Sequence, residues 1–208
     1  MRKLLLLAVL MCISRMLIAQ INKGSSIINL DGIFTYSYTS DKITSFAQSG
    51  YKIEPTYEYF LKDNISLGLG INYANNSTLI TNNYKRDQSK YGASLFFKRY
   101  LTISPKILLY LMPQISINSG SYKYVSVSSS FTDAYDFSHN SFSINCGVSY
   151  FTKSNIALNL KLNTFQFSSV SGPNFSYKSF DFLSLANPEL LMFGVKFLLN
   201  KPIGSKKL

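Results

Sequence analysis

Short segments of alternating polarity recur along the chain, and this pattern limits its possible folds more than any other feature. In the clearest segment, at 65–74, the apolar residues Ile65, Leu67, Leu69 and Ile71 alternate with small or polar residues. A period of two residues predicts a β-strand with one apolar and one polar face. Eight such segments, each about ten residues long, occur at 28–38, 51–61, 65–74, 91–98, 107–118, 142–151, 156–163 and 191–199.

The links between these segments are of two kinds. Three links are tight and rich in turn-forming residues, at 62–64, 103–105 and 152–155. The others are longer and polar, at 40–50, 75–89, 119–139 and 168–187. Transmembrane barrels have short periplasmic turns and longer outer loops, and their tilted strands cross the bilayer with about 9–11 residues. The pattern therefore predicts an all-β fold, an eight-stranded antiparallel up-and-down transmembrane β-barrel over residues 20–200.

The N-terminal residues 1–19 have the features of a targeting segment. Arg2 and Lys3 precede an apolar stretch at 4–13, and Ala19 is a small residue suited to cleavage. This arrangement predicts a cleaved signal peptide and export to the cell outer membrane. No later apolar stretch approaches the roughly 18 residues of a spanning helix. Residues 201–208 form a short basic C-terminal tail.

The polar face of the predicted strands favours a membrane barrel over a soluble one. Only 15% of the residues are charged, whereas a soluble domain averages about 25%. Small and polar residues suit the narrow, filled lumen of an eight-stranded barrel. Buried charges are costly unless they are paired, so we predict a charge network inside this lumen. Its members are Asp31, Lys52, Glu54, Glu58, Lys98, Lys161 and Lys196.

Two segments resemble a known family. Residues 53–70 place a Pro and a Tyr-Phe pair before an Asp-Asn turn and a Gly-rich strand, and 147–158 look like a second copy. This strand–turn–strand signature is similar to that of the small outer-membrane β-barrel proteins of Gram-negative bacteria. These are OmpA/OmpX-like eight-stranded barrels without a periplasmic domain. The resemblance implies the fold and no particular activity.

Few residues could carry chemistry. With one histidine and two cysteines, the chain holds neither a multi-Cys/His zinc site nor a disulfide framework. His139 and Ser141 have the spacing found in outer-membrane lipid A deacylases, which are also eight-stranded barrels. No Asp or Glu lies between Asp136 and Asp181 to orient the histidine, and a serine without an oriented base is poorly activated. We therefore place His139 in a loop or at a strand start, and predict no catalytic, metal or cofactor site.

The charge balance indicates the expected partners. The formal net charge is +11, and the basic residues are scattered without a stripe. We expect contact with outer-membrane lipid and anionic lipopolysaccharide, and insertion by the barrel-assembly machinery. Nucleic-acid binding is not expected of an exported barrel. The closed fold is expected to be a monomer.

These observations favour a structural or surface-interaction role in the outer membrane without catalysis. Three alternatives stay open. The lumen charges could line a narrow ion channel or small porin, and His139 could belong to a lipid A-modifying barrel enzyme. A soluble lipocalin-like carrier would also show alternating strands, but its apolar face would point inward. Tyrosines at strand ends favour the membrane barrel, whose interfaces carry aromatic girdles: Tyr38, Tyr51, Tyr73, Tyr91 and Tyr150.

Overall fold

The computed structural model describes residues 21, 23–40, 45–81, 84–126, 132–153, 155–182 and 191–199. The predicted signal peptide at 1–19 and the basic tail at 201–208 lie outside these residues, and both stay predictions. All regular structure in the described part of the chain is β-strand. No helix in that part is long and apolar enough to cross a membrane.

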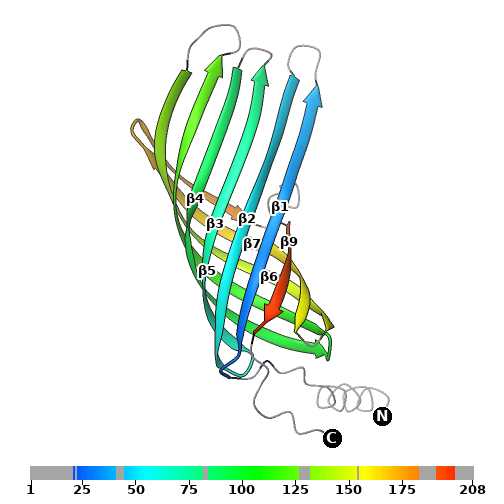
Figure 1. Ribbon diagram of the computed structural model, residues 1–208. Helices are drawn as coiled ribbons and strands as arrows, with labels where there is room; N and C mark the ends of the chain where they lie inside the picture. Colours follow the sequence, from blue (N-terminus) through cyan, green and yellow to red (C-terminus); the bar gives the residue numbers. More distant parts are fainter. Residues whose placement is uncertain are drawn as a thin grey trace, which may run out of the picture.

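The described residues form nine strands; the first eight run up and down in turn, and the ninth runs in the same direction as the eighth (Figure 1). Each strand is antiparallel to the strands that it pairs with. The strands are β1 (Ser26–Ser40), β2 (Ser45–Lys62), β3 (Ile65–Thr81), β4 (Tyr84–Ser104), β5 (Ile107–Ser126), β6 (Thr132–Lys153), β7 (Ile156–Gly172), β8 (Phe175–Phe182) and β9 (Leu191–Leu198).

The sheet closes on itself with eight strand positions, which confirms the predicted barrel. Strands β1 to β7 pair in sequence order, and β9 pairs with both β7 and β1. The eighth position is shared by two strands, because β8 pairs with Phe165–Gly172 of β7 and β9 pairs with Ile156–Leu162. In the sequence, eight residues, 183–190, separate β8 from β9. On the neighbouring strand β7, only residues 163 and 164 separate the part that pairs with β9 from the part that pairs with β8.

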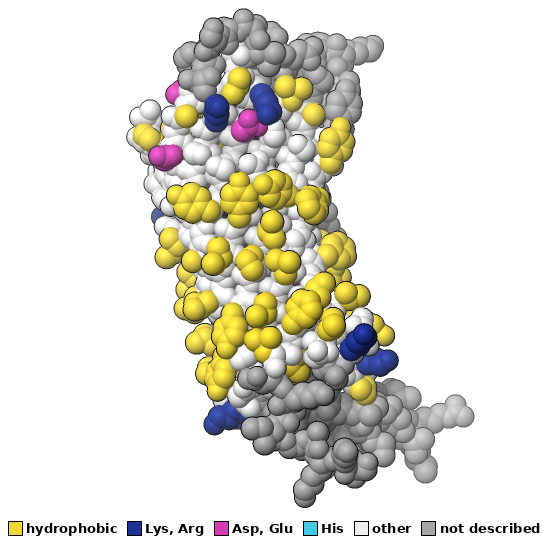
Figure 2. Space-filling view, viewed as in Figure 1, with side chains coloured by type: hydrophobic (Ala, Val, Ile, Leu, Met, Phe, Trp, Pro, Cys, Tyr) yellow, Lys and Arg dark blue, Asp and Glu magenta, His cyan; other side chains and the backbone are white. Residues whose placement is uncertain are grey.

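The barrel has its apolar face outside and its polar face inside. Figure 2 shows a broad band of hydrophobic side chains, with charged side chains gathered above and below it. Exposed residues of this band include Leu69, Ile71, Ile117 and Phe193. Such a belt matches the hydrocarbon core of a bilayer. A lipocalin-like carrier would have the reverse arrangement.

The tight turns lie together at one end, called here the turn end. Those at 63–64 and 105–106 follow β2 and β4, and the third short link joins Lys153 of β6 to Ile156 of β7, as predicted. Asn64 has a φ of 61°, a left-handed conformation that Asn adopts more readily than most residues. At the same end, the backbone N–H of Lys23 donates to Asp63 Oδ1 at 2.9 Å, which fixes the chain just before β1. In outer-membrane barrels this end faces the periplasm.

At the opposite end, the strands continue well past the apolar belt, and the predicted long loops are wrong here. Strands β4 and β6 have 21 and 22 residues, and pairing continues from Tyr84 opposite Ser126 to Val125 opposite Thr132. Beyond the bilayer neither face needs to be apolar, so the alternation that marks a strand disappears while the backbone ladder continues. We call residues 84–90, 119–126 and 132–138 the polar extension.

The predicted loop at 168–187 is also wrong in part. Residues 168–172 belong to β7, and Phe175–Phe182 form β8. The two strands are joined by a turn at 173–174, and Ser168 Oγ lies 2.7 Å from Ser179 Oγ across the pair. This stretch is Ser- and Phe-rich on both faces, so it lacks the apolar–polar alternation on which the prediction rested.

Candidate functional site

The lumen next to the turn end is filled by apolar and aromatic side chains. Phe60 stacks on Tyr100 with ring centroids 5.6 Å apart. Gly68 on β3 leaves room for the Phe96 ring, because a Cβ at this glycine would lie 2.2 Å from Phe96 Cζ. Side chains packed in this way fill a narrow barrel instead of lining a pore. We call this group the lower plug: Ile27, Phe60, Phe96, Tyr100, Leu108 and Tyr110.

The carboxylate of Glu58 sits among the residues of the plug and is fully buried. Lys98 Nζ lies 3.2 Å from Glu58 Oε1. The Tyr100 hydroxyl donates to both carboxylate oxygens, at 2.9 and 3.0 Å, and the Ser66 hydroxyl donates to Oε2 at 2.8 Å. Every lone-pair direction of a buried carboxylate needs such a partner, because its solvation by water has been lost.

Lys196 connects the last strand to this group. It lies on β9, and its ammonium donates to the Tyr100 hydroxyl at 3.1 Å and to the Ser149 hydroxyl at 2.8 Å. The same ammonium stands 4.4 Å from the ring centroid of Tyr110. A cation over an aromatic face is attracted by the ring quadrupole. Lys196 thus links β9 to β4, β5 and β6 through the interior.

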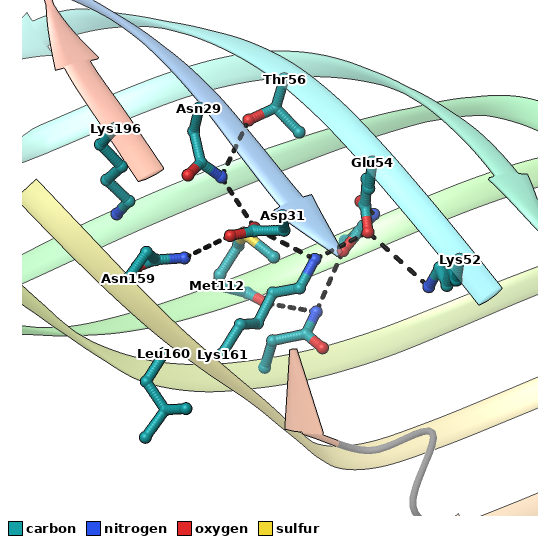
Figure 3. A network of polar contacts seen from close by, with 12 residues as sticks. Asn29, Asp31, Lys52, Glu54, Thr56, Met112, Asn159, Leu160, Lys161 and Lys196 are labelled. Carbon is teal, nitrogen blue, oxygen red and sulfur yellow. Dashed lines mark hydrogen bonds and ion pairs between the residues drawn. The ribbon is translucent and has the colours of Figure 1, made fainter. Parts of the chain in front are cut away.

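A second group of charges lies above the plug, toward the polar extension. Figure 3 shows its members Asp31, Lys52, Glu54 and Lys161. Lys161 Nζ lies 2.7 Å from Glu54 Oε2 and 3.5 Å from Asp31 Oδ2. Lys52 Nζ is 3.7 Å from Glu54 Oε2, and its side chain is 36% exposed, whereas the other three residues are buried. One lysine on β7 therefore bridges carboxylates from β1 and β2.

Amide side chains complete the partners of these two carboxylates. Gln114 Nε2 donates to Glu54 Oε1 at 2.7 Å. Asn29 and Asn159 each donate to Asp31 at 2.7 Å, from β1 itself and from β7. All seven charges singled out in the sequence thus point into the lumen, in a lower group and an upper group. The lower group is Glu58, Lys98 and Lys196, and the upper group is Asp31, Lys52, Glu54 and Lys161.

Above the upper group the lumen opens into a polar cavity of about 320 Å³, called here the upper cavity. Glu54, Lys161 and Gln114 form its floor, and Tyr122, Phe137 and Tyr177 line it toward the polar extension. Its wall is rich in side-chain amides and hydroxyls. The amides are Asn72, Asn76, Gln88, Gln114, Asn118, Asn145, Asn163 and Gln166.

His139 lies in this wall, so the prediction of a loop or strand-start position is wrong. It is in the interior of β6, opposite Asn118 of β5, and only 9% of it is exposed. Its Nδ1 is 3.3 Å from Lys90 Nζ. Strand β6 begins at Thr132, ten residues before the alternating segment at 142–151, so sequence alternation placed the start too late. Ser141 also lines the cavity.

The geometry around His139 does not form a catalytic triad. The ring nitrogen faces a lysine, whereas a general base of this kind needs a carboxylate to orient it. In the part of the chain that the structure describes, no three His, Cys, Asp or Glu residues stand close enough to hold a metal ion.

An aromatic cluster lies at the mouth of the upper cavity. Its residues belong to the segments 119–139 and 168–187, which we predicted to be loops. Tyr122 packs on Phe137 with centroids 4.5 Å apart, and Tyr135 donates its hydroxyl to Tyr124 at 3.1 Å. Phe175 meets Tyr135 edge-on at 5.7 Å. Burial in this cluster raises the pKa of Tyr122 to about 12. The signal was available, because Tyr122 and Tyr124, like Tyr135 and Phe137, alternate as inward residues of a strand do.

Solved structures with a similar fold come from several bacteria. Neisserial surface protein A (NspA) is 14% identical, with 85% of this chain and 98% of that chain covered and a TM-score of 0.49. The attachment invasion locus protein Ail of Yersinia pestis is 12% identical, with coverage of 85% and 99% and a TM-score of 0.46. A major outer membrane protein from Thermus thermophilus is 12% identical, with coverage of 85% and 99% and a TM-score of 0.49.

Comparison with curated protein sequences finds no match. A family match, in contrast, extends over most of the chain. The family model described as "Outer membrane protein beta-barrel domain" matches residues 5–183. The match includes β1 to β8 and leaves out only β9. It agrees with the closed sheet and the outward apolar belt. The chain therefore belongs to the outer membrane protein β-barrel family.

Proposed function

We propose that this barrel has a structural or surface-interaction role in the outer membrane and that it neither catalyses a reaction nor conducts solutes. The observation that carries the proposal is the polar extension, in which β4, β5 and β6 continue as a paired ladder past the apolar belt. A ladder holds its side chains in fixed positions, as a recognition surface requires. The chain would be exported through a signal peptide cleaved near Ala19 and inserted by the barrel-assembly machinery as a monomer.

The filled lumen argues against the channel alternative. The lower plug and the two charge groups occupy the barrel from the turn end to the floor of the upper cavity. An ion on this route would have to displace packed rings and break buried ion pairs at two successive levels. The lipid A-modifying alternative lacks an oriented base, because His139 faces Lys90.

The proposed surface contact is with the anionic groups of lipopolysaccharide. Lys85 on β4, Lys123 on β5 and Lys178 on β8 are exposed beyond the belt. Lysines at this height meet the phosphate groups of the outer leaflet, whose attraction is reduced by salt. We call these three residues the rim lysines.

The test compares two double variants in bilayers with and without lipopolysaccharide. Lys123→Glu with Lys178→Glu reverses two rim lysines, and Lys62→Glu with Lys153→Glu makes the same change at exposed positions of the turn end. We expect lipopolysaccharide to raise the unfolding midpoint of the unmodified barrel and of the turn-end variant, but not that of the rim variant. Equal responses of the two variants would contradict the proposed contact.

A further inference from the structure

We propose that the upper cavity is a binding site for a small hydroxylated organic anion, a polyol of sugar size that carries one carboxylate or phosphate group. The inference is independent of the surface contact proposed above. It rests on the size of the cavity, on two lysines on one side of it, and on the amides and hydroxyls that line it.

The cavity has the size of a small-molecule site. Its volume of about 320 Å³ is at the lower end of the range for ligand pockets, about 300–1,000 Å³. The lining is dominated by amides and hydroxyls, so an apolar ligand would gain little by entering. The floor of Glu54 and Lys161 closes the way to the plug, so a solute that enters is held and does not pass through.

Two lysines give one wall a positive pole. Lys52 on β2 and Lys90 on β4 stand on either side of Ala74 on β3, since the register pairs Ala74 with both. Two strand spacings separate the lysines, about 10 Å between backbones. Both side chains line the cavity, and the short Ala74 leaves the space between them open. An anionic group at this point would lie within reach of both ammonium groups.

Among the described residues that line the cavity, three lysines face two carboxylates, Glu54 and Asp181, so the lysines are in excess. Lys161 is already held by Glu54 and Asp31, at 2.7 and 3.5 Å. The distance from Lys52 to Glu54 is longer, 3.7 Å, and Lys90 contacts the imidazole of His139. Asp181, the other carboxylate that lines the cavity, lies on β8. The anionic group of a ligand is therefore expected on the β2–β4 side of the cavity.

The groups that line the wall favour a ligand with hydroxyl groups. Side-chain amides such as Asn72 and Gln88, and hydroxyls such as Ser116 and Ser141, line the upper cavity. Amides and hydroxyls both donate and accept hydrogen bonds, so the wall can pair with the O–H groups of a ligand in either direction. A hydroxylated anion therefore fits better than a simple one.

The single histidine offers a direct probe of the site. Protein labelled with 13C-histidine, purified without a histidine tag and folded in micelles, gives one imidazole signal, from His139. The signal is followed during titration with glucuronate, glucose 6-phosphate, glucose and inorganic phosphate. We expect a saturable shift with glucuronate or glucose 6-phosphate, and binding at least about tenfold weaker with glucose and with inorganic phosphate.

Substitutions test whether the shift of the His139 signal depends on the positive pole formed by Lys52 and Lys90. Lys52→Gln and Lys90→Gln should each weaken binding by about tenfold, and Ala74→Leu, which keeps both charges, should block the space between them. Lys62→Gln, at an exposed position of the turn end and outside the cavity, is the matched control and should bind as the unmodified chain does. Each variant is accepted only if it keeps the heat-dependent gel mobility of a folded barrel.

Three results would overturn the proposal. The first is no saturable shift with either sugar anion up to about 10 mM, which would mean that the cavity holds only water. The second is that glucose or inorganic phosphate binds as tightly as the sugar anions. This would show that the site does not require hydroxyl groups and an anionic group together. The third is unchanged binding in the Ala74→Leu variant and in both lysine variants.

Discussion

At the scale of single residues, the barrel interior depends on complete pairing of its charges. Glu58 has Lys98, Tyr100 and Ser66 as partners, and no atom of it reaches solvent. Removing an ion from water costs several kcal/mol, and a buried pair recovers this only when the remaining hydrogen bonds are also made. The pair is therefore sensitive to the loss of one member and more tolerant of the loss of both.

The variant Glu58→Ala leaves Lys98 and Lys196 in the lower lumen without this carboxylate. We expect it to lower the free energy of unfolding by about 3–5 kcal/mol, the usual cost of breaking a buried pair. The double variant Glu58→Leu with Lys98→Met should be less destabilised than Glu58→Ala. Urea unfolding of the folded barrel, followed by gel mobility, measures both.

The exposed pair Lys85–Asp87 is the matched control, with an Nζ–Oδ2 distance of 3.0 Å. Because solvent screens it, Lys85→Ala should change stability by no more than about 1 kcal/mol. A Glu58→Ala barrel as stable as this control would show that the lower charge group is not needed for folding.

His139 gives a second prediction at the residue scale. Its imidazole contacts Lys90, and none of the described residues places a carboxylate against it to orient it as a base. Cells that produce the His139→Ala variant should therefore have the same lipid A profile by mass spectrometry as cells with the unmodified protein. A lipid A species that disappears with this substitution, while the folded barrel is still present, would support the enzymatic alternative.

At the scale of elements, the sequence predicted the membrane-spanning parts well and the outer parts poorly. A bilayer makes one face of each strand apolar, as at 65–74, and that face is visible as alternation. In the polar extension water surrounds the strands, and the residues that keep pairing there are mostly Ser, Tyr, Lys and Asp. Strand β8 and the true start of β6 were missed for the same reason.

The same difference explains which parts of the candidate site could be predicted from the sequence. The lumen charges were visible because each occupies the polar position of an alternating strand, as Glu54 and Glu58 do. Their division into two groups depends on cross-barrel contacts, such as Lys161 with Asp31, that join residues far apart in sequence. Spacing along the chain carries no information on such contacts. His139 and the upper cavity were missed because they lie where alternation ends.

Amide hydrogen exchange tests the assignment of the polar extension. Backbone groups that pair across β5 and β6, such as those near Tyr122 and Tyr135, should exchange much more slowly than unpaired amides. The turn at 173–174 supplies an internal reference for fast exchange. Fast exchange throughout 119–126 and 132–138 would restore the loop prediction and weaken the proposed recognition surface.

At the scale of the whole molecule, the barrel is closed at the turn end and hollow toward the polar extension. The apolar belt fixes its depth in the outer membrane, and the ladder of β1 to β7 with β9 leaves the lower half without a free strand edge in the described residues. The lower plug and both charge groups then separate the upper cavity from the turn end. We therefore expect the molecule to present its sites to one side of the membrane and to offer no route across it.

Electrical recording in planar bilayers tests this central claim most directly. The protein is inserted after its folded state has been verified by heat-dependent gel mobility, and currents are recorded at low and high salt. We expect no single-channel conductance above background, because packed rings and buried ion pairs fill the lower lumen. Discrete, reproducible openings that change when Glu58 or Lys196 is neutralised would show a conducting lumen and contradict the account.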